Sequence, residues 1–210
     1  IEKDNILLFR EHLNNSALNP IDKEVARINL SLPKDDFIIG YVGSSFPCDL
    51  KLMQESFAYV KARIPQVKLL HIGRSNYFVE SDTSVINTGN IDAQRLNAYL
   101  NACDLFWLPL IDSNANRGRF PIKLSDYLSV GRPIVATAVG DIEELITENN
   151  IGLIADDDPQ AITEAVVRLY KNRVMAETYS QNALRMANTN AYSWQKSAKD
   201  LESFYMRKIS

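Results

Sequence analysis

Glycine is scarce in this chain, which has eight glycines among 210 residues, roughly half of the usual ~7%. None of them lies in the first 39 or the last 58 residues. No stretch fits G-x-G-x-x-G, and no glycine precedes a Lys-Ser or Lys-Thr pair. The dinucleotide-binding fingerprint and the Walker A phosphate loop are therefore excluded.

Cysteine, histidine and long apolar runs are scarce as well. Cys48 and Cys103 form no C-x-x-C pair, which predicts free thiols and a reducing, cytoplasmic environment. With only His12 and His71, we expect no metal site, and no cofactor is indicated. No apolar run approaches the ~18 residues of a membrane-spanning helix, and no signal peptide is recognisable. The net charge of −3 disfavours a nucleic-acid binder.

What the sequence does contain is an alternation of apolar and helical segments, with 46% hydrophobic residues to fill a core. Near-continuous apolar runs are typical of parallel strands covered on both faces. They occupy residues 37–42, 67–72, 84–87, 104–108, 133–137 and 151–154, while 6–9 are ambiguous. The pattern predicts an α/β fold, a Rossmann-like doubly wound parallel sheet of about six strands flanked by helices, with a helical C-terminal tail. Such sheets bind ligands beyond the carboxyl ends of their strands.

The chain divides into three regions. Residues 1–32 are predicted to be a lead-in or hinge segment with a short helix over 21–30, and residues 33–172 form the Rossmann-like domain. Residues 173–210 form C-terminal helices, the last of which carries an apolar stripe through Trp194, Leu201 and Tyr205. These helices pack either on this domain or on a neighbouring one, and the sequence leaves both alternatives open.

Residues 110–132 follow the fourth strand, and basic side chains gather there. A polar loop that enters a helix offers backbone N–H groups and a positive dipole end, and basic side chains add affinity for a diphosphate. Asp126 lies three residues after Lys123, on the same helix face, where a carboxylate suits sugar hydroxyls. The alternative is an exposed loop with structural ion pairs. The charged residues are Asp112, Arg117, Arg119, Lys123, Asp126 and Arg132.

The segment RFPIKLSDYLSVGRPIVATAVGDIEELI resembles the signature of the carboxyl-terminal, donor-binding domain of GT-B fold, family-4 retaining glycosyltransferases (glycosyl transferases group 1). FIIGYVGSS resembles the first strand and phosphate loop of that domain, VKLLHIG its second strand, and LNACDLFWLPL a later one. The resemblance covers roughly residues 22–172. It implies sugar transfer from a nucleoside-diphosphate sugar to an acceptor hydroxyl, with retention and without a bound metal.

The resemblance also implies roles for individual residues. The loop after the first strand would approach the diphosphate, Asn90 and Ile91 would border the nucleobase near Arg74, and Asp126 would hold the ribose. Arg119 and Lys123 would stabilise the leaving group. The substrate-binding residues implied are Gly43, Ser44, Ser45, Arg74, Asn90, Ile91, Arg117, Ile122 and Asp126.

Two departures from the family pattern affect these roles. The first acidic residue of the family's pair should lie eight residues before Asp126, where this chain has Gly118. In the first loop, Ser44 stands at the usual arginine position, Asp49 lies near the usual lysine position, and Lys51 is shifted. Our hypothesis is that the lost positive charge comes instead from Arg117, Arg119 and Lys123.

Enzymes of this kind have two domains, and we expect the acceptor-binding N-terminal domain to lie outside this chain, which begins at Ile1. The nucleotide-sugar donor and that domain are the expected partners, with peripheral membrane association through the absent domain. This hexosyltransferase domain is expected to be inactive when isolated. The alternative is a non-catalytic nucleotide-binding or interaction module on the same fold. His71, inside a strand, is expected to be a core or rim residue.

Overall fold

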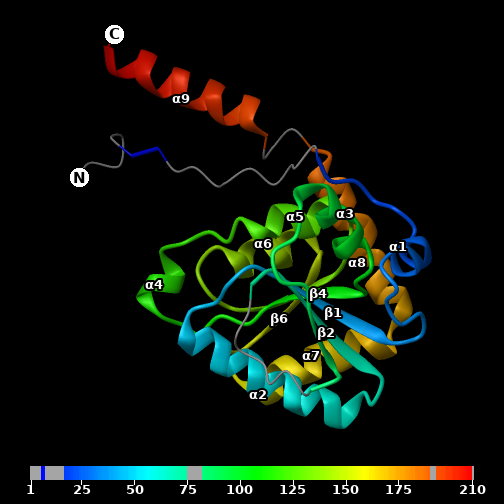
Figure 1. Ribbon diagram of the computed structural model, residues 1–210. Helices are drawn as coiled ribbons and strands as arrows, with labels where there is room; N and C mark the ends of the chain where they lie inside the picture. The colour runs from blue at the N-terminus through cyan, green and yellow to red at the C-terminus, as the bar shows by residue number, and fades with distance from the viewer. Residues whose placement is uncertain (1–5, 8–16, 75–81, 190–192, 210) are drawn as a thin grey trace.

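The computed structural model describes residues 6–7, 17–74, 82–189 and 193–209, and the statements below concern these residues. Its core is a parallel sheet in the order β3-β2-β1-β4-β5-β6 (Figure 1). All six predicted strands are confirmed to within one or two residues. Of the ambiguous segment 6–9, Ile6 and Leu7 lie in no strand or helix, and residues 8–9 are outside the described residues. The strands are β1 (Phe37–Val42), β2 (Val67–Ile72), β3 (Val85–Asn87), β4 (Leu105–Leu108), β5 (Ile134–Thr137) and β6 (Gly152–Ala155).

Helices cover both faces of the sheet, as the continuous apolar strands required. The helices α2 and α7 lie on one face, and α3, α5, α6 and α8 lie on the other (Figure 1). Within β1, Ile38 faces one core, and Ile39 and Tyr41 face the other. The helices are α1 (Lys23–Asn29), α2 (Pro47–Arg63), α3 (Ala93–Asn101), α4 (Asn114–Arg117), α5 (Lys123–Ser129), α6 (Ile142–Asn149), α7 (Pro159–Lys171), α8 (Arg173–Ala187) and α9 (Trp194–Ile209).

The two C-terminal helices have different surroundings. Ala183 and Met186 of α8 are buried in the core that also contains α5. Helix α9 stands apart from the sheet (Figure 1), and it leaves Trp194 71% exposed and Tyr205 59% exposed. The predicted apolar stripe is therefore present on α9, but in the described part of the chain it is not buried in the Rossmann-like domain.

Charged residues cluster at the amino-terminal edge of the sheet, where α1 joins it. The Asp104 carboxylate, just before β4, accepts a hydrogen bond from Arg27 at 2.6 Å and from Lys23 at 2.5 Å. Arg27 is only 2% exposed and also donates to the backbone oxygens of Ala102, Lys34 and Asp36. This network fixes α1 to the sheet.

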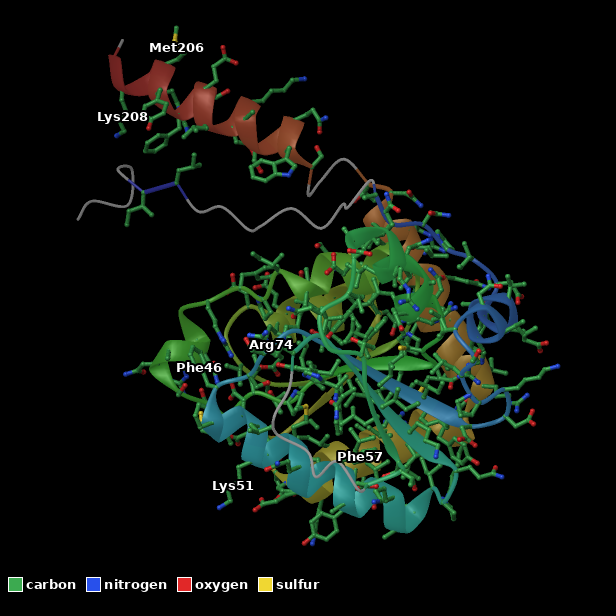
Figure 2. All side chains as sticks on the ribbon, viewed as in Figure 1. Phe46, Lys51, Phe57, Arg74, Met206 and Lys208 are labelled. Carbon is green, nitrogen blue, oxygen red and sulfur yellow. The ribbon has the colours of Figure 1, made fainter. Side chains whose placement is uncertain are left out.

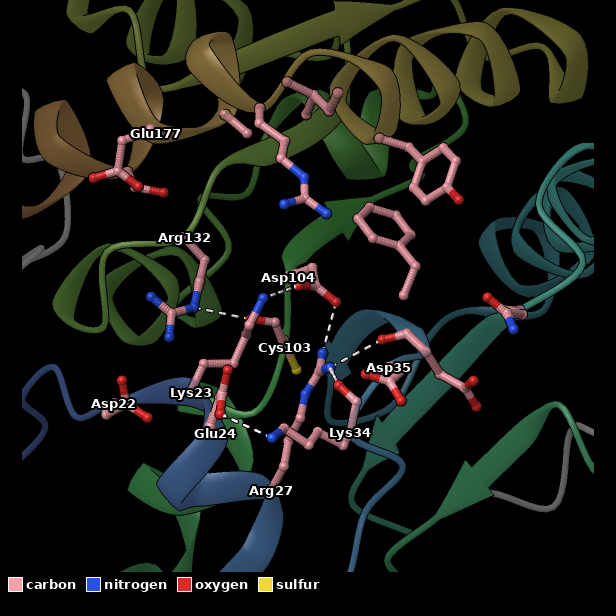
Figure 3. Close-up of a pocket in the computed structure, with 18 of the residues that line it drawn as sticks. Asp22, Lys23, Glu24, Arg27, Lys34, Asp35, Cys103, Asp104, Arg132 and Glu177 are labelled. Atoms are coloured by element: carbon pink, nitrogen blue, oxygen red, sulfur yellow. Dashed lines mark hydrogen bonds and ion pairs between the residues drawn. The ribbon is translucent and has the colours of Figure 1, made fainter.

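A cavity of about 810 Å³ opens beside this network (Figure 3). Its walls carry acidic and basic residues in similar number, including Glu24 and Lys34, which form an ion pair of 3.3 Å. Because acidic and basic residues are similar in number and several of them form ion pairs, the cavity has no dominant sign of charge. It lies at the opposite edge of the sheet from the carboxyl ends of the strands.

Candidate functional site

The carboxyl ends of β1 and β4 form the switch point of this sheet. The chain builds the sheet from β1 through β2 to β3 on one side, and then returns to the centre and continues from β4 through β5 to β6 on the other. The loops that follow the strands on this side are joined to one another. The Gly43 N–H donates to the Ile72 oxygen at 2.8 Å, and Gly73 pairs with Gly89 in an isolated antiparallel bridge. The loops after β1, β2 and β3 therefore form one continuous rim.

Lys123 reaches this rim from the other side of the switch point. It is the first residue of α5, and its Nζ donates to the Tyr41 hydroxyl at 2.8 Å while lying 3.9 Å from the centre of the Tyr41 ring. Tyr41 lies opposite His71 in the β1–β2 register and stacks on it, with ring centres 5.6 Å apart. Lys123, Tyr41 and His71 thus form one cluster at the ends of β1 and β2.

The ammonium group of Lys123 is poorly hydrated in this cluster. Burial and, to a smaller extent, the positive charge of Arg119 lower its pKa to about 7, although the negative charge of Asp49 opposes the shift. Near pH 7 about half of the Lys123 side chains therefore carry a charge. A bound anion would favour the charged form, so the site can take up a proton together with an anion.

Asp49, in the first turn of α2, connects the first loop to residues 110–119. Its carboxylate is 1% exposed and accepts hydrogen bonds from the Ile111 N–H at 2.9 Å and the Asn116 Nδ2 at 2.8 Å. It also forms an ion pair of 2.9 Å with Arg119, whose guanidinium lies 4.5 Å from the centre of the Phe46 ring. The Asp49 carboxylate, which lies near the position where the family pattern has a lysine, therefore holds Arg119 of the later loop in place.

The basic residues grouped by the sequence separate in space. Arg119 and Lys123 lie near each other, whereas Arg117 makes two hydrogen bonds of 2.5 Å to the exposed Asp112 and thereby lowers the pKa of that carboxyl. Lys51 points away from the sheet (Figure 2) and pairs with Glu55 on the same helix at 3.8 Å. Two cations therefore remain beside the first loop, and Arg117 is engaged elsewhere.

The remaining predicted residues lie around the same edge of the sheet. Ser44 is exposed, and the Ser45 hydroxyl contacts the Tyr41 hydroxyl. Arg74 follows the Gly73 bridge on the loop after β2 (Figure 2), opposite the loop that carries Asn90 and Ile91. Ile122 is 68% exposed beside Lys123, and Asp126 is half-buried on α5. These placements are compatible with one ligand spanning the loops, but the roles of the individual residues stay predictions.

Sequence reasoning missed the supporting residues of this site. Tyr41 was one apolar strand position among several, and Tyr127 was only part of a signature. The Tyr127 hydroxyl accepts a hydrogen bond from the Val42 N–H at 3.1 Å, and its ring stacks on Phe106 with centres 3.9 Å apart. The predicted strand ends at residues 42 and 72 could have indicated that Tyr41 and His71 are neighbours. Residues at equivalent positions before the ends of adjacent parallel strands lie side by side.

The fold and the site define a class of protein. A parallel sheet of order 3-2-1-4-5-6 has the topology of the Rossmann fold, and sheets of this kind bind ligands at the switch point. The sequence profile described as glycosyl transferases group 1 matches residues 36–172, which is more than half of the chain. The chain belongs to the group 1 glycosyltransferase family.

Individual relatives agree with this assignment. A D-inositol 3-phosphate glycosyltransferase of Corynebacterium urealyticum is 31% identical over 117 residues, which are 53% of this chain and 25% of that protein. Sucrose-phosphate synthase from Thermosynechococcus elongatus superposes with a TM-score of 0.76 at 21% identity, covering 97% of this chain and 52% of that one. Anabaena HepE, solved in complex with UDP-glucose, superposes with a TM-score of 0.64 at 18% identity, covering 87% of this chain and 52% of that one.

These similarities confirm the predicted family and fold. The C-terminal domain of a group 1 glycosyltransferase (LpcC) from Francisella tularensis also superposes with a TM-score of 0.68 at 13% identity, covering 84% of this chain and 97% of that domain. The chain covers about half the length of the Thermosynechococcus and Anabaena structures, and the matched segment is a quarter of the Corynebacterium relative. In the described part of the chain, no helix combines the length and the apolar character needed to cross a membrane.

Proposed function

We propose that this domain binds the nucleoside-diphosphate-sugar donor of a retaining glycosyltransferase. The observation that carries the proposal is the contact of Lys123 with Tyr41, because it brings an ammonium group from α5 to the loop after β1 at the switch point. The diphosphate would lie between residues 43–45 and Lys123, with Arg119 beside it. Asp126 would accept hydrogen bonds from the ribose, and Asn90, Ile91 and Arg74 would border the base.

The chemical contribution of this domain is stabilisation of the leaving group. Departure of a nucleoside diphosphate develops negative charge, and fixed cations and N–H donors stabilise it without reorganisation. Lys123 would supply a charge that anion binding itself promotes, and Asp49 would hold Arg119 in position. We assign no general base and no metal to this domain, and we expect its cations and backbone N–H groups to stabilise the leaving group.

We further propose that α9 packs against an acceptor-binding domain, which would complete a two-domain enzyme. The exposed apolar side chains Trp194 and Tyr205 support this, because a helix of this kind gains stability when its stripe is covered. The free Cys48 and Cys103 thiols support a cytoplasmic location. Membrane association would be a property of the other domain, and the present chain alone is expected to transfer little or no sugar.

Calorimetric titration of the 210-residue chain with UDP, GDP and ADP tests the proposal. We expect one of them to bind with a dissociation constant in the micromolar to millimolar range, roughly 4–8 kcal/mol of binding free energy. Binding of none would overturn the donor-site proposal and favour the alternative, an interaction module on the same fold.

The affinity for that nucleoside diphosphate should depend on pH. The folded-state pKa of Lys123 is about 7, so the charged form that binds phosphate becomes scarcer as the pH rises above 7. Between pH 7 and 8 the affinity should fall about fivefold, while that of the matching nucleoside should stay constant. Calorimetry in buffers of different ionisation enthalpy should also detect proton uptake. A flat profile for the diphosphate would contradict the role of Lys123.

Gly118→Glu should restore the carboxylate that the family pattern expects. Gly118 ends α4 with a φ of −86°, which any residue adopts, and a Cβ there meets only the Asn114 oxygen, at 3.3 Å. We expect an unchanged or slightly higher melting temperature and a severalfold gain in affinity for the sugar nucleotide relative to the nucleoside diphosphate. Gly118→Gln is the matched uncharged control. If Gly118→Glu changed the affinities for the sugar nucleotide and the nucleoside diphosphate equally, the carboxylate would have no role in binding the sugar.

A further inference from the structure

The loop after β1 has two successive carbonyl groups held by two neighbouring side chains. The Nε2 of His71 lies 2.8 Å from the Gly43 oxygen, and the Tyr41 hydroxyl donates to the Ser44 oxygen at 3.1 Å. His71 is completely buried and Tyr41 is 2% exposed. Side chains near the carboxyl ends of β1 and β2 therefore fix the backbone of this loop.

The protonation of His71 follows from its surroundings. A carbonyl oxygen only accepts hydrogen bonds, so Nε2 carries the proton, and the buried Nδ1 has no partner among the described residues. Burial lowers the pKa of His71, and the positive charge of Lys123 lowers it too, although the nearby backbone at Gly43 and Gly73 opposes this. His71 is thus neutral and acts as a fixed donor.

The geometry of the peptide bond turns these two contacts into an arrangement of donors. In a trans peptide unit the C=O and the following N–H point in opposite directions, and no cis peptide occurs in the described residues. The N–H of Ser44 therefore points away from His71, and the N–H of Ser45 points away from the Tyr41 hydroxyl. No described residue accepts a hydrogen bond from either N–H. The φ of +81° at Gly43 lets the chain turn this way.

We infer that His71 and Tyr41 are positioning residues that fix the loop after β1 so that the N–H groups of Ser44 and Ser45 receive the donor diphosphate. Successive backbone N–H groups that point to one side are a known way to bind anions. The inference rests on the proposed donor site, and it adds two side chains that need not touch the substrate.

Tyr41 also couples this loop to the cation of the site. Its oxygen accepts the hydrogen bond from Lys123 while its proton is donated to the Ser44 oxygen. One hydroxyl thus sets both the direction of the loop and the place of the ammonium group. Loss of this hydroxyl should disturb phosphate binding through both, without altering the base-binding loops.

Substitutions of His71 can distinguish a role in positioning the loop after β1 from a role in packing the core alone. His71→Leu removes the donor, and His71→Gln keeps an N–H near the position of Nε2. We expect His71→Leu to lower the affinity for the nucleoside diphosphate about tenfold and to leave the affinity for the matching nucleoside unchanged. His71→Gln should retain most of the affinity for the diphosphate. Unchanged diphosphate affinity, or equal losses for both ligands, would overturn the inference while the proposed function stands. Tyr41→Phe serves as a second variant if His71→Leu does not fold, and the same pattern is expected.

A wild-type chain that binds none of UDP, GDP and ADP would refute the proposed function separately. In that case, titration of the ¹⁵N-labelled chain with inorganic pyrophosphate would still test the role of His71 and Tyr41. Shifts of the Ser44 and Ser45 amide resonances in the wild type, lost in His71→Leu or, should that variant not fold, in Tyr41→Phe, would support it. The absence of such shifts in the wild type would overturn it.

Discussion

Lys123→Met is expected to weaken nucleoside-diphosphate binding by about 10- to 100-fold and, at the same time, to stabilise the ligand-free protein. The first effect follows from the loss of a charge-assisted hydrogen bond to phosphate, worth roughly 1.5–3 kcal/mol. The second follows from the burial of an ammonium group whose pKa in the folded chain is about 7. Methionine has a similar length and requires no such desolvation.

The stabilising effect has a defined pH dependence. Lys123 has a folded-state pKa of about 7, below the ordinary lysine value of 10.5, so the unfolded chain binds more protons between these two values. The wild type is therefore penalised most at and below pH 7, on the order of 5 kcal/mol, and least near pH 10. The stability gained by Lys123→Met should shrink as the pH rises from 7 to 10.

The matched control for Lys123→Met is Lys51→Met, since Lys51 is exposed and pairs only weakly with Glu55. It should change neither the melting temperature nor the affinity by a measurable amount. Binding by calorimetry and unfolding by urea, on all three proteins, complete the comparison. Equal diphosphate affinity of Lys123→Met and the wild type would contradict the assigned role of Lys123.

Asp104→Ala is expected to destabilise the protein by about 3–5 kcal/mol and to lower its melting temperature by roughly 10 °C. The substitution leaves the buried guanidinium of Arg27 without its carboxylate partner, 2.6 Å away, and removes the acceptor of the Ile38 N–H. The effect is large because the charge of Arg27 stays buried while its compensation is lost.

Nucleotide affinity measured at a temperature where Asp104→Ala is folded should equal that of the wild type. The charged cavity beside Arg27 lies at the amino-terminal edge of the sheet (Figure 3) and is assigned a structural role only. Glu24→Ala, which breaks the exposed pair with Lys34, is the control and should cost less than about 1 kcal/mol. A specific loss of nucleotide affinity in folded Asp104→Ala would place a ligand at this cavity.

The sheet could be predicted from the sequence because its strands carry a local signal. Residues 37–42 and 67–72 are apolar almost without interruption, which requires cover on both faces and excludes a solvent-facing sheet. Asp158 followed by Pro159 predicts the start of α7, and the Asp158 carboxylate does accept the Gln160 and Ala161 N–H groups at 2.9 Å. Such features depend on neighbours within a few residues.

The site could be predicted only in outline, because its contacts join residues distant in sequence. Proximity in the chain grouped Arg117 with Arg119, but the one-turn helix α4 directs Arg117 to Asp112. The partner of Arg119 is Asp49, 70 residues earlier, which the sequence marks only as a departure from the family pattern. Register and crossover connections decide such pairings, and composition or periodicity does not encode them.

The most direct test of the donor site is a map of the amides that respond to nucleotide. The ¹⁵N-labelled chain would be titrated with UDP, GDP and ADP and the resonances assigned. We predict that one nucleotide shifts the amides of Ser44, Asn90, Lys123 and Asp126 together, at the carboxyl edge of the sheet. Shifts confined to the cavity beside Arg27, or no shifts with any of the three, would contradict the account.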